Sequence, residues 1–162
     1  MRFEAGVKGC GMDESDDKAT LGGLLRRLVE TLDADVEASY VAAGLDFRPR
    51  FTPVLRALLT GPKTIKAIAA QALISHSAAS QTISQMIDGG WLIRATGEDG
   101  RERLLSLSPH ALKHLPLLEK RWAATASAVA DLDAELGVSL TEVARRALAA
   151  LARKSFRDRL SR

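Results

Sequence analysis

One stretch of the chain is rich in side chains that can contact the edges of base pairs. Glutamine can bond bidentately to adenine, serine and threonine can bond bases or phosphates, and the alanine methyl group can meet a thymine methyl group. We expect these side chains to form the outward face of one helix. The predicted contact residues are Ser75, His76, Ser77, Ala78, Gln81, Thr82 and Gln85.

Basic side chains flank this stretch, which itself contains no lysine or arginine between residues 75 and 88. Contacts to phosphate are therefore expected from outside the helix. An arginine at the tip of a hairpin can enter a narrow minor groove, where the negative potential is enhanced. The predicted basic contacts are Lys63, Lys66, Arg94, Arg101 and Arg103, and Asp99 is expected to form the hairpin turn.

The elements that would position these side chains can be predicted from apolar spacing and turn residues. Apolar residues recur at helical spacing over 64–73 and 77–88, and a Gly-Gly pair follows the second helix. Strands are expected at 91–95 and 103–107, around an Asp-Gly turn. Two short helices followed at once by a hairpin make a winged helix-turn-helix, in which the second helix enters the major groove.

Longer helices are predicted on both sides of this unit. The first spans 20–43, and a short helix opens at Pro53. A long helix is expected over 109–136, in which Pro116 must kink or break the chain because its ring clashes with the preceding turn. A capping box at 139–142 opens the last helix, whose apolar face extends toward residue 160. The predicted fold class is mainly α with a small β-hairpin wing (α+β).

The ordered set of motifs resembles the MarR family of bacterial transcription regulators. The resemblance is carried by the run Gly-Pro-Lys-Thr-Ile-Lys-Ala-Ile-Ala at 61–69, by the helix that ends in Gly-Gly-Trp-Leu-Ile-Arg at 89–94, and by the wing. The wing has the family pattern of an Asp and an Arg two residues apart, followed by an apolar strand. The matching wing residues are Asp99, Arg101, Leu107 and Ser108.

The resemblance implies a homodimer that binds a double-stranded DNA operator with two similar half-sites, and we expect a repressor. It also implies that the first and last helices of two subunits interlock, and that a small-molecule effector can bind between this base and the winged domain. Aromatic residues at helical spacing are more often core, but Tyr40, Phe47, Phe51 and Trp122 are candidates for such a pocket.

We predict four parts along the chain. These are a flexible tail at 1–19, a helical dimerisation region at 20–44 and 137–162, a winged helix-turn-helix DNA-binding domain at 45–110 and a linking helix at 111–136. The tail contains Cys10, the one cysteine, so no disulfide can form within the chain. The last segment is basic and is expected to be solvated or to pair with acidic residues of a second subunit.

Composition excludes other classes of protein. Hydrophobic residues make up 46% and charged residues 27%, as in a globular protein, and no apolar run could span a membrane. A cytoplasmic protein without cofactor is expected.

His110 and His114 lie four residues apart, but with no third ligand evident we predict no metal site. No arrangement of residues suggests an enzyme, so the alternative function is a winged-helix module that binds another protein.

Overall fold

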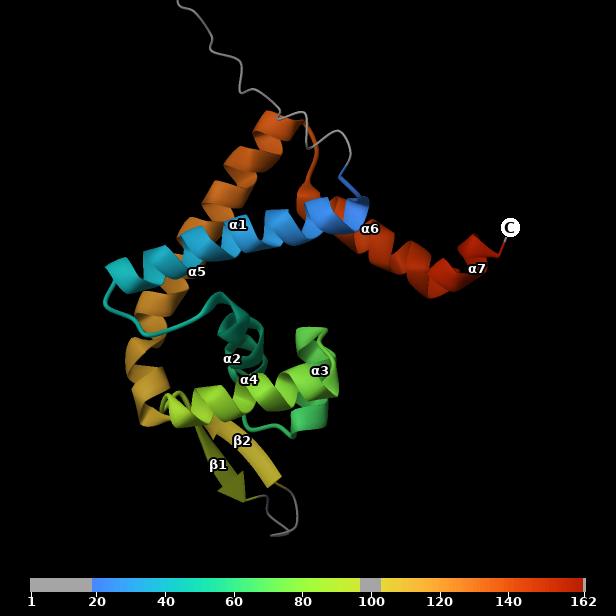
Figure 1. The fold of residues 1–162 in the computed structure, drawn as a ribbon. Helices are drawn as coiled ribbons and strands as arrows, with labels where there is room; N and C mark the ends of the chain where they lie inside the picture. Colours follow the sequence, from blue (N-terminus) through green and yellow to red (C-terminus); the bar gives the residue numbers. More distant parts are fainter. Residues whose placement is uncertain (1–18, 97–102, 162) are drawn as a thin grey trace, which may run out of the picture. The chain divides into compact units, whose positions relative to one another are not determined.

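The computed structural model describes residues 19–96 and 103–161 (Figure 1). The chain divides into two compact units, residues 1–49 and 50–162. Most of the predicted tail, with Cys10, and the predicted turn with Asp99 and Arg101 lie outside the described residues.

The first unit contains one long helix, α1 (Leu21–Ala42). Thr20 caps it, since its hydroxyl oxygen accepts a hydrogen bond from the backbone N–H of Gly23 at 3.2 Å. The helix ends before Gly44, which takes a φ of +72° that suits glycine. The predicted helix at 20–43 is confirmed. All five of its leucines are exposed, as are Val29 and Val41.

In the second unit, three short helices pack on one another around a common core. A 3-10 turn (Pro49–Phe51) leads into α2 (Thr52–Leu58), and α3 (Ile65–Ala72) and α4 (His76–Asp88) follow. Thr64 and Ser75 cap α3 and α4. The core is formed by aliphatic side chains from all three helices: Val54, Leu55, Leu58, Ile68, Ile83 and Met86. The positions of all three helices were predictable from the sequence.

After α4 along the chain, strand β1 (Leu92–Thr96) pairs antiparallel with β2 (Arg103–Leu107). Lys63 extends this hairpin, because its backbone exchanges two hydrogen bonds with Leu105, at 2.9 and 3.0 Å. The sheet packs on the helices through the buried side chains of Leu92 and Leu105. The predicted fold class, mainly helical with a hairpin wing, is confirmed.

The long helix α5 (Pro109–Leu136) starts at a buried junction. The hydroxyl of Ser108 donates to the carbonyl of Gly90 and accepts from the backbone N–H of Ala111 at 3.0 Å, which ties the helix start to the strand entry. Of the two predicted outcomes at Pro116, a kink or a break, the break does not occur, since the helix continues through it. A proline removes only one hydrogen bond, and the turns on either side keep theirs.

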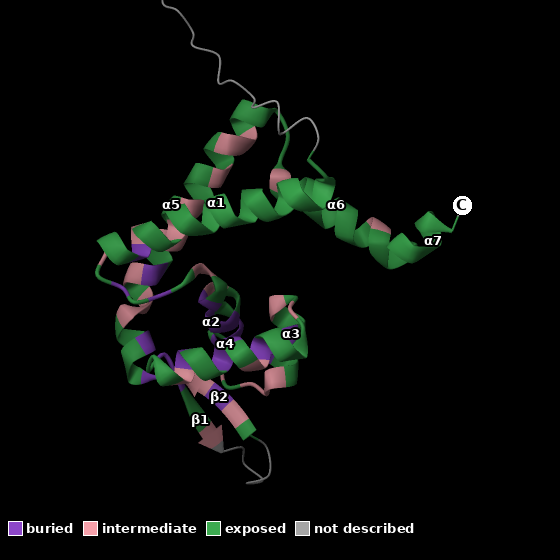
Figure 2. Ribbon diagram, viewed as in Figure 1, coloured by how far each residue is buried: buried purple, intermediate pink, exposed green. Residues whose placement is uncertain are grey.

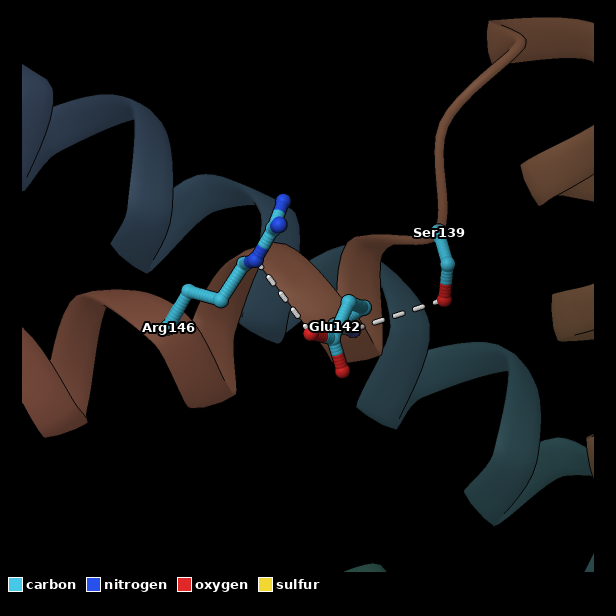
Figure 3. A network of polar contacts seen from close by, with 3 residues as sticks. All are labelled: Ser139, Glu142 and Arg146. Atoms are coloured by element: carbon cyan, nitrogen blue, oxygen red, sulfur yellow. Dashed lines mark hydrogen bonds and ion pairs between the residues drawn. The ribbon is translucent and has the colours of Figure 1, made fainter.

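The C-terminal segment forms two helices, α6 (Leu140–Arg153) and α7 (Phe156–Leu160), with the chain leaving helical geometry at Lys154. Figure 3 shows the start of α6, where the hydroxyl oxygen of Ser139 accepts from the backbone N–H of Glu142 at 3.4 Å. The Glu142 carboxylate lies 3.3 Å from Nε of Arg146. The Ser139 half of the predicted capping box is therefore present, while the Glu142 carboxylate pairs with Arg146 one turn later.

None of the described helices combines the length and the apolar character that a membrane span requires.

Candidate nucleic-acid interface

The outward face of α4 carries most of the predicted base-contacting side chains. His76, Ser77, Ala78, Gln81 and Gln85 are exposed. Ser75 is exposed too, and its hydroxyl oxygen caps the helix by accepting from the backbone N–H of Ala78 at 3.1 Å. Figure 2 shows α4 with exposed positions on one side and buried ones on the other. The helix thus presents amides and hydroxyls at the spacing that groove contact needs.

Thr82 was predicted to point outward, and this orientation is wrong. Its side chain is only 9% exposed and belongs to the buried face with Ala79, Ile83 and Met86. Residues three and four apart share a helix face, so Thr82 follows Ala79 and precedes Met86 on the inward side. The same spacing places Ser84, which the sequence analysis passed over, at an exposed position.

A hollow of about 340 Å³ lies along α4. Arg50 and Pro53 border it from the start of the second unit, and Ile74 borders it from the turn before α4. The remaining lining residues belong to α4 itself: Ala78, Gln81, Thr82 and Gln85. The guanidinium of Arg50 lies 5.7 Å from the ring centroid of the adjacent Phe51. A positive charge from outside α4 therefore stands beside its polar face.

Sequence reasoning missed Arg50 for a physical reason. It lies 25 or more residues before the α4 side chains, and only the packing of α2 against α4 brings it to the hollow. One feature of the sequence could have indicated Arg50. It lies just before Pro53, at the start of a helix that would pack on the helix-turn-helix.

The other predicted basic residues lie on three elements. Lys63 is half-buried and its Nζ donates to the hydroxyl oxygen of Thr60 at 2.9 Å, whereas Lys66 is exposed on α3. Arg94 and Arg103 are exposed on the two strands of the wing. The pairing of Arg94 with Leu105 and of Thr96 with Arg103 puts both arginines on one face of the hairpin.

The four aromatic pocket candidates belong to different units. In the first unit, the rings of Tyr40 and Phe47 are buried and meet edge to face with centroids 5.2 Å apart. In the second unit, Phe51 is buried and the Arg56 guanidinium stands 5.0 Å from the ring centroid of Trp122. These contacts are those of packed aromatic side chains.

Comparison with known proteins relates the central part of the chain to one family. Residues 46–102 match the sequence model described as the MarR family, and this range includes α2, α3, α4 and β1. Over these residues the chain is similar to MarR-family transcription regulators. The MarR family is one of regulators and not of enzymes. A search of curated proteins finds no match.

Solved structures similar to this chain share its fold along most of its length. The transcriptional repressor CouR, solved bound to a 23-mer DNA duplex, aligns with a TM-score of 0.62 at 20% identity, over 88% of this chain and 97% of its own. A probable transcriptional regulator from Pseudomonas aeruginosa aligns with a TM-score of 0.59 at 24% identity, over 85% and 98%. NadR in complex with 4-hydroxyphenylacetate aligns with a TM-score of 0.56 at 19% identity, over 85% and 95%.

Proposed function

We propose that this chain is a MarR-family repressor that binds a two-fold symmetric operator as a homodimer. In this proposal α4 of each subunit enters the major groove, with Gln81 and Gln85 as the main base-reading side chains and Ser77 and Ala78 beside them. The observation that carries it is the exposed polar face of α4 next to a hairpin with two exposed arginines. Such a regulator acts in the cytoplasm, where the DNA is.

Phosphate contacts in this proposal come from around α4, because the helix has no basic side chain. Lys66 on α3 and the wing residues Arg94, Arg101 and Arg103 supply positive charge from the sides, as we predict from the sequence. Arg50 adds a charge at the hollow that Gln81 and Gln85 line. Phosphate contacts fix the register of a protein on the duplex, and base contacts then give specificity.

The homodimer is supported by apolar side chains that a single chain leaves in solvent. On α1, the side chains of Leu21, Leu24, Leu25, Leu28, Val29 and Leu32 are exposed. On α6 and α7, the exposed apolar side chains are Val143, Leu148, Leu151, Phe156 and Leu160. Apolar surface of this extent in a soluble protein marks an interaction site. A second copy of the chain is the partner that the family resemblance implies.

Charge supports the same assembly. Glu30, Asp33, Asp35 and Glu37 make α1 acidic, and burial, followed by the neighbouring charge of Glu37, raises the pKa of Asp33. The segment 145–159 contains six basic residues: Arg145, Arg146, Arg153, Lys154, Arg157 and Arg159. Contacts between the acidic helix of one subunit and the basic segment of the other would lower the repulsion within each.

Release by a small-molecule effector is the second part of the proposal. NadR, similar in fold, was solved with 4-hydroxyphenylacetate, an aromatic acid. Phe51 and Trp122 remain the candidate aromatic contacts in the second unit, and Tyr40 and Phe47 remain those in the first. Arg121 precedes Trp122 on α5, and its Nε is buried without a hydrogen-bond partner, so a carboxylate group would suit it.

The test is binding of the purified protein to DNA flanking its own gene, with scrambled DNA as competitor, for the wild type and three variants. Q81A and Q85A are expected to lose about 1–3 kcal/mol of discrimination between operator and scrambled DNA. Q71A is the matched control, since Gln71 is exposed on α3 and outside α4. It should bind like the wild type.

Two outcomes count against the proposal. Wild-type binding that does not distinguish any flanking segment from scrambled DNA favours the protein-docking module, for which a neutral α4 is well suited. Equal losses in Q71A and Q85A would show that α4 does not read the bases.

A further inference from the structure

Two of the three histidines in the chain gather at the start of α5, against a buried tryptophan. The imidazole centroids of His110 and His114 are 4.3 Å apart. The ring of Trp91, only 2% exposed, meets His110 edge to face at 4.7 Å and His114 at 5.8 Å. None of these three side chains is needed for the proposed DNA contacts, so the arrangement calls for its own explanation.

A hydrogen bond determines which ring nitrogen of His114 carries a proton. Nδ1 of His114 lies 2.9 Å from the backbone carbonyl oxygen of His110. A carbonyl oxygen only accepts, so Nδ1 of His114 carries a proton, and in the neutral imidazole Nε2 then has the lone pair. A histidine that binds a metal ion is held in the same way, with one ring nitrogen donating to a carbonyl and the other free to coordinate.

The spacing of the pair also suits joint coordination. Residues four apart lie on one helix face, one turn apart. His110 is exposed and His114 is half-buried, so solvent ions can reach both. The first turn of α5 is held in place by the two hydrogen bonds of Ser108 and by Pro109. Little further ordering of the backbone is therefore required when an ion binds.

We infer that His110 and His114 form a binding site for a divalent transition-metal ion of the kind that prefers imidazole. Cu²⁺ is expected to bind most tightly, ahead of Zn²⁺ and Ni²⁺. In the part of the chain that the structure describes, no three His, Cys, Asp or Glu side chains cluster. The ion would thus take two protein ligands and complete its coordination with water. This revises the prediction, made because no third ligand is evident in the sequence, that the chain has no metal site.

The inference does not depend on DNA binding, because the site belongs to one chain and uses none of the proposed contact residues. Trp91 offers a direct readout, since bound Cu²⁺ quenches the fluorescence of a tryptophan that its ligands touch. The experiment titrates Cu²⁺, and then Zn²⁺ in competition, into the full chain carrying C10S and W122F. These substitutions remove the thiol and the second tryptophan.

Quenching is expected to saturate at one ion per chain. H110A and H114A should each raise the dissociation constant by more than about tenfold. H76A is the matched control, because His76 is the third histidine and lies on α4, and it should leave the titration unchanged. Circular dichroism checks that each variant is folded, and H110Q and H114Q replace an alanine variant that is not.

Four results would overturn the inference. The first is quenching that does not saturate, and the second is quenching that survives both H110A and H114A. The third is weaker binding in only one of these two variants, which would mean a single histidine ligand. The fourth is an equal weakening of binding by H76A, which would place the ion elsewhere.

Discussion

Arg50 brings positive charge to the edge of a helix that has none. It lines the hollow beside Gln81 and Gln85. Its planar guanidinium can pair with a phosphate through two parallel hydrogen bonds. Among the residues that line the hollow, Arg50 is the one basic side chain that a phosphate beside α4 would meet. Arg50 should therefore add affinity for every DNA sequence, whereas Gln81 and Gln85 should add discrimination.

We predict that R50A weakens binding to operator and scrambled DNA alike, by about tenfold or more, because a hydrogen bond to a charged group is lost. A plot of the logarithm of the association constant against the logarithm of the salt concentration has a negative slope. Its magnitude should decrease by about one per subunit in R50A. R50K, which keeps the charge, should keep the slope. The measurement is fluorescence anisotropy of labelled duplex at several salt concentrations.

The control for this prediction is K120A, which removes a positive charge from an exposed position on α5. An unchanged slope in R50A, in a protein whose wild type binds DNA, would exclude the contact and leave the proposed function intact.

At the scale of elements, local signals predicted the helix-turn-helix and the wing well. Thr64, Ser75 and Ser108 are the N-caps of α3, α4 and α5. The predicted bounds of β2 are those observed. These signals act between residues three or four apart, so they can be found without knowledge of the fold.

Features that depend on packing were less predictable. The orientation of Thr82 is decided by where α2 and α3 meet α4, and Arg50 reaches the hollow only through that packing. The helix break at Lys154 has no glycine or proline to mark it, and Ser155 is the one cap signal there. Pro116 is the opposite case, a strong breaker that a long helix accommodates.

The turn between α3 and α4 contains a strained residue that yields a second prediction. Leu73 takes a φ of +56°, a left-handed conformation that costs a side chain with a Cβ atom roughly 1–2 kcal/mol. Its side chain is 84% exposed, so removing it loses little burial. L73G should therefore stabilise the protein by about 1 kcal/mol. Urea unfolding followed by circular dichroism measures the change.

Leu59 provides the matched comparison for Leu73. It also follows a helix and is partly exposed, but its φ is −62°, where glycine has no advantage. L59G should destabilise by about 0.5–1 kcal/mol or more. If L73G were as destabilising as L59G, the exposed leucine would have to make contacts in solution that outweigh its strain.

For the molecule as a whole, the question is what covers the apolar side chains of α6. Leu148 is 61% exposed, Val143 51% and Leu151 40%, and Figure 2 shows the helix exposed along almost its whole length. A helix with an uncovered apolar face of this kind is stable only against a partner. In a two-fold assembly each substitution is present twice, so its effect on association is doubled.

We predict that L148D converts the protein from dimer to monomer. Two unpaired carboxylates would be buried at the interface, at a cost of about 3 kcal/mol or more, which is more than about a hundredfold in the dissociation constant. Sedimentation equilibrium at micromolar concentration measures the mass. L73D is the control. Leu73 is an exposed leucine in the turn of the helix-turn-helix and lies outside the predicted dimerisation region. A wild type that sediments as a monomer, or an L148D variant that remains a dimer, would contradict the assembly.

Loss of the dimer should also reduce operator affinity far more than affinity for a single half-site, because only a dimer engages both half-sites at once.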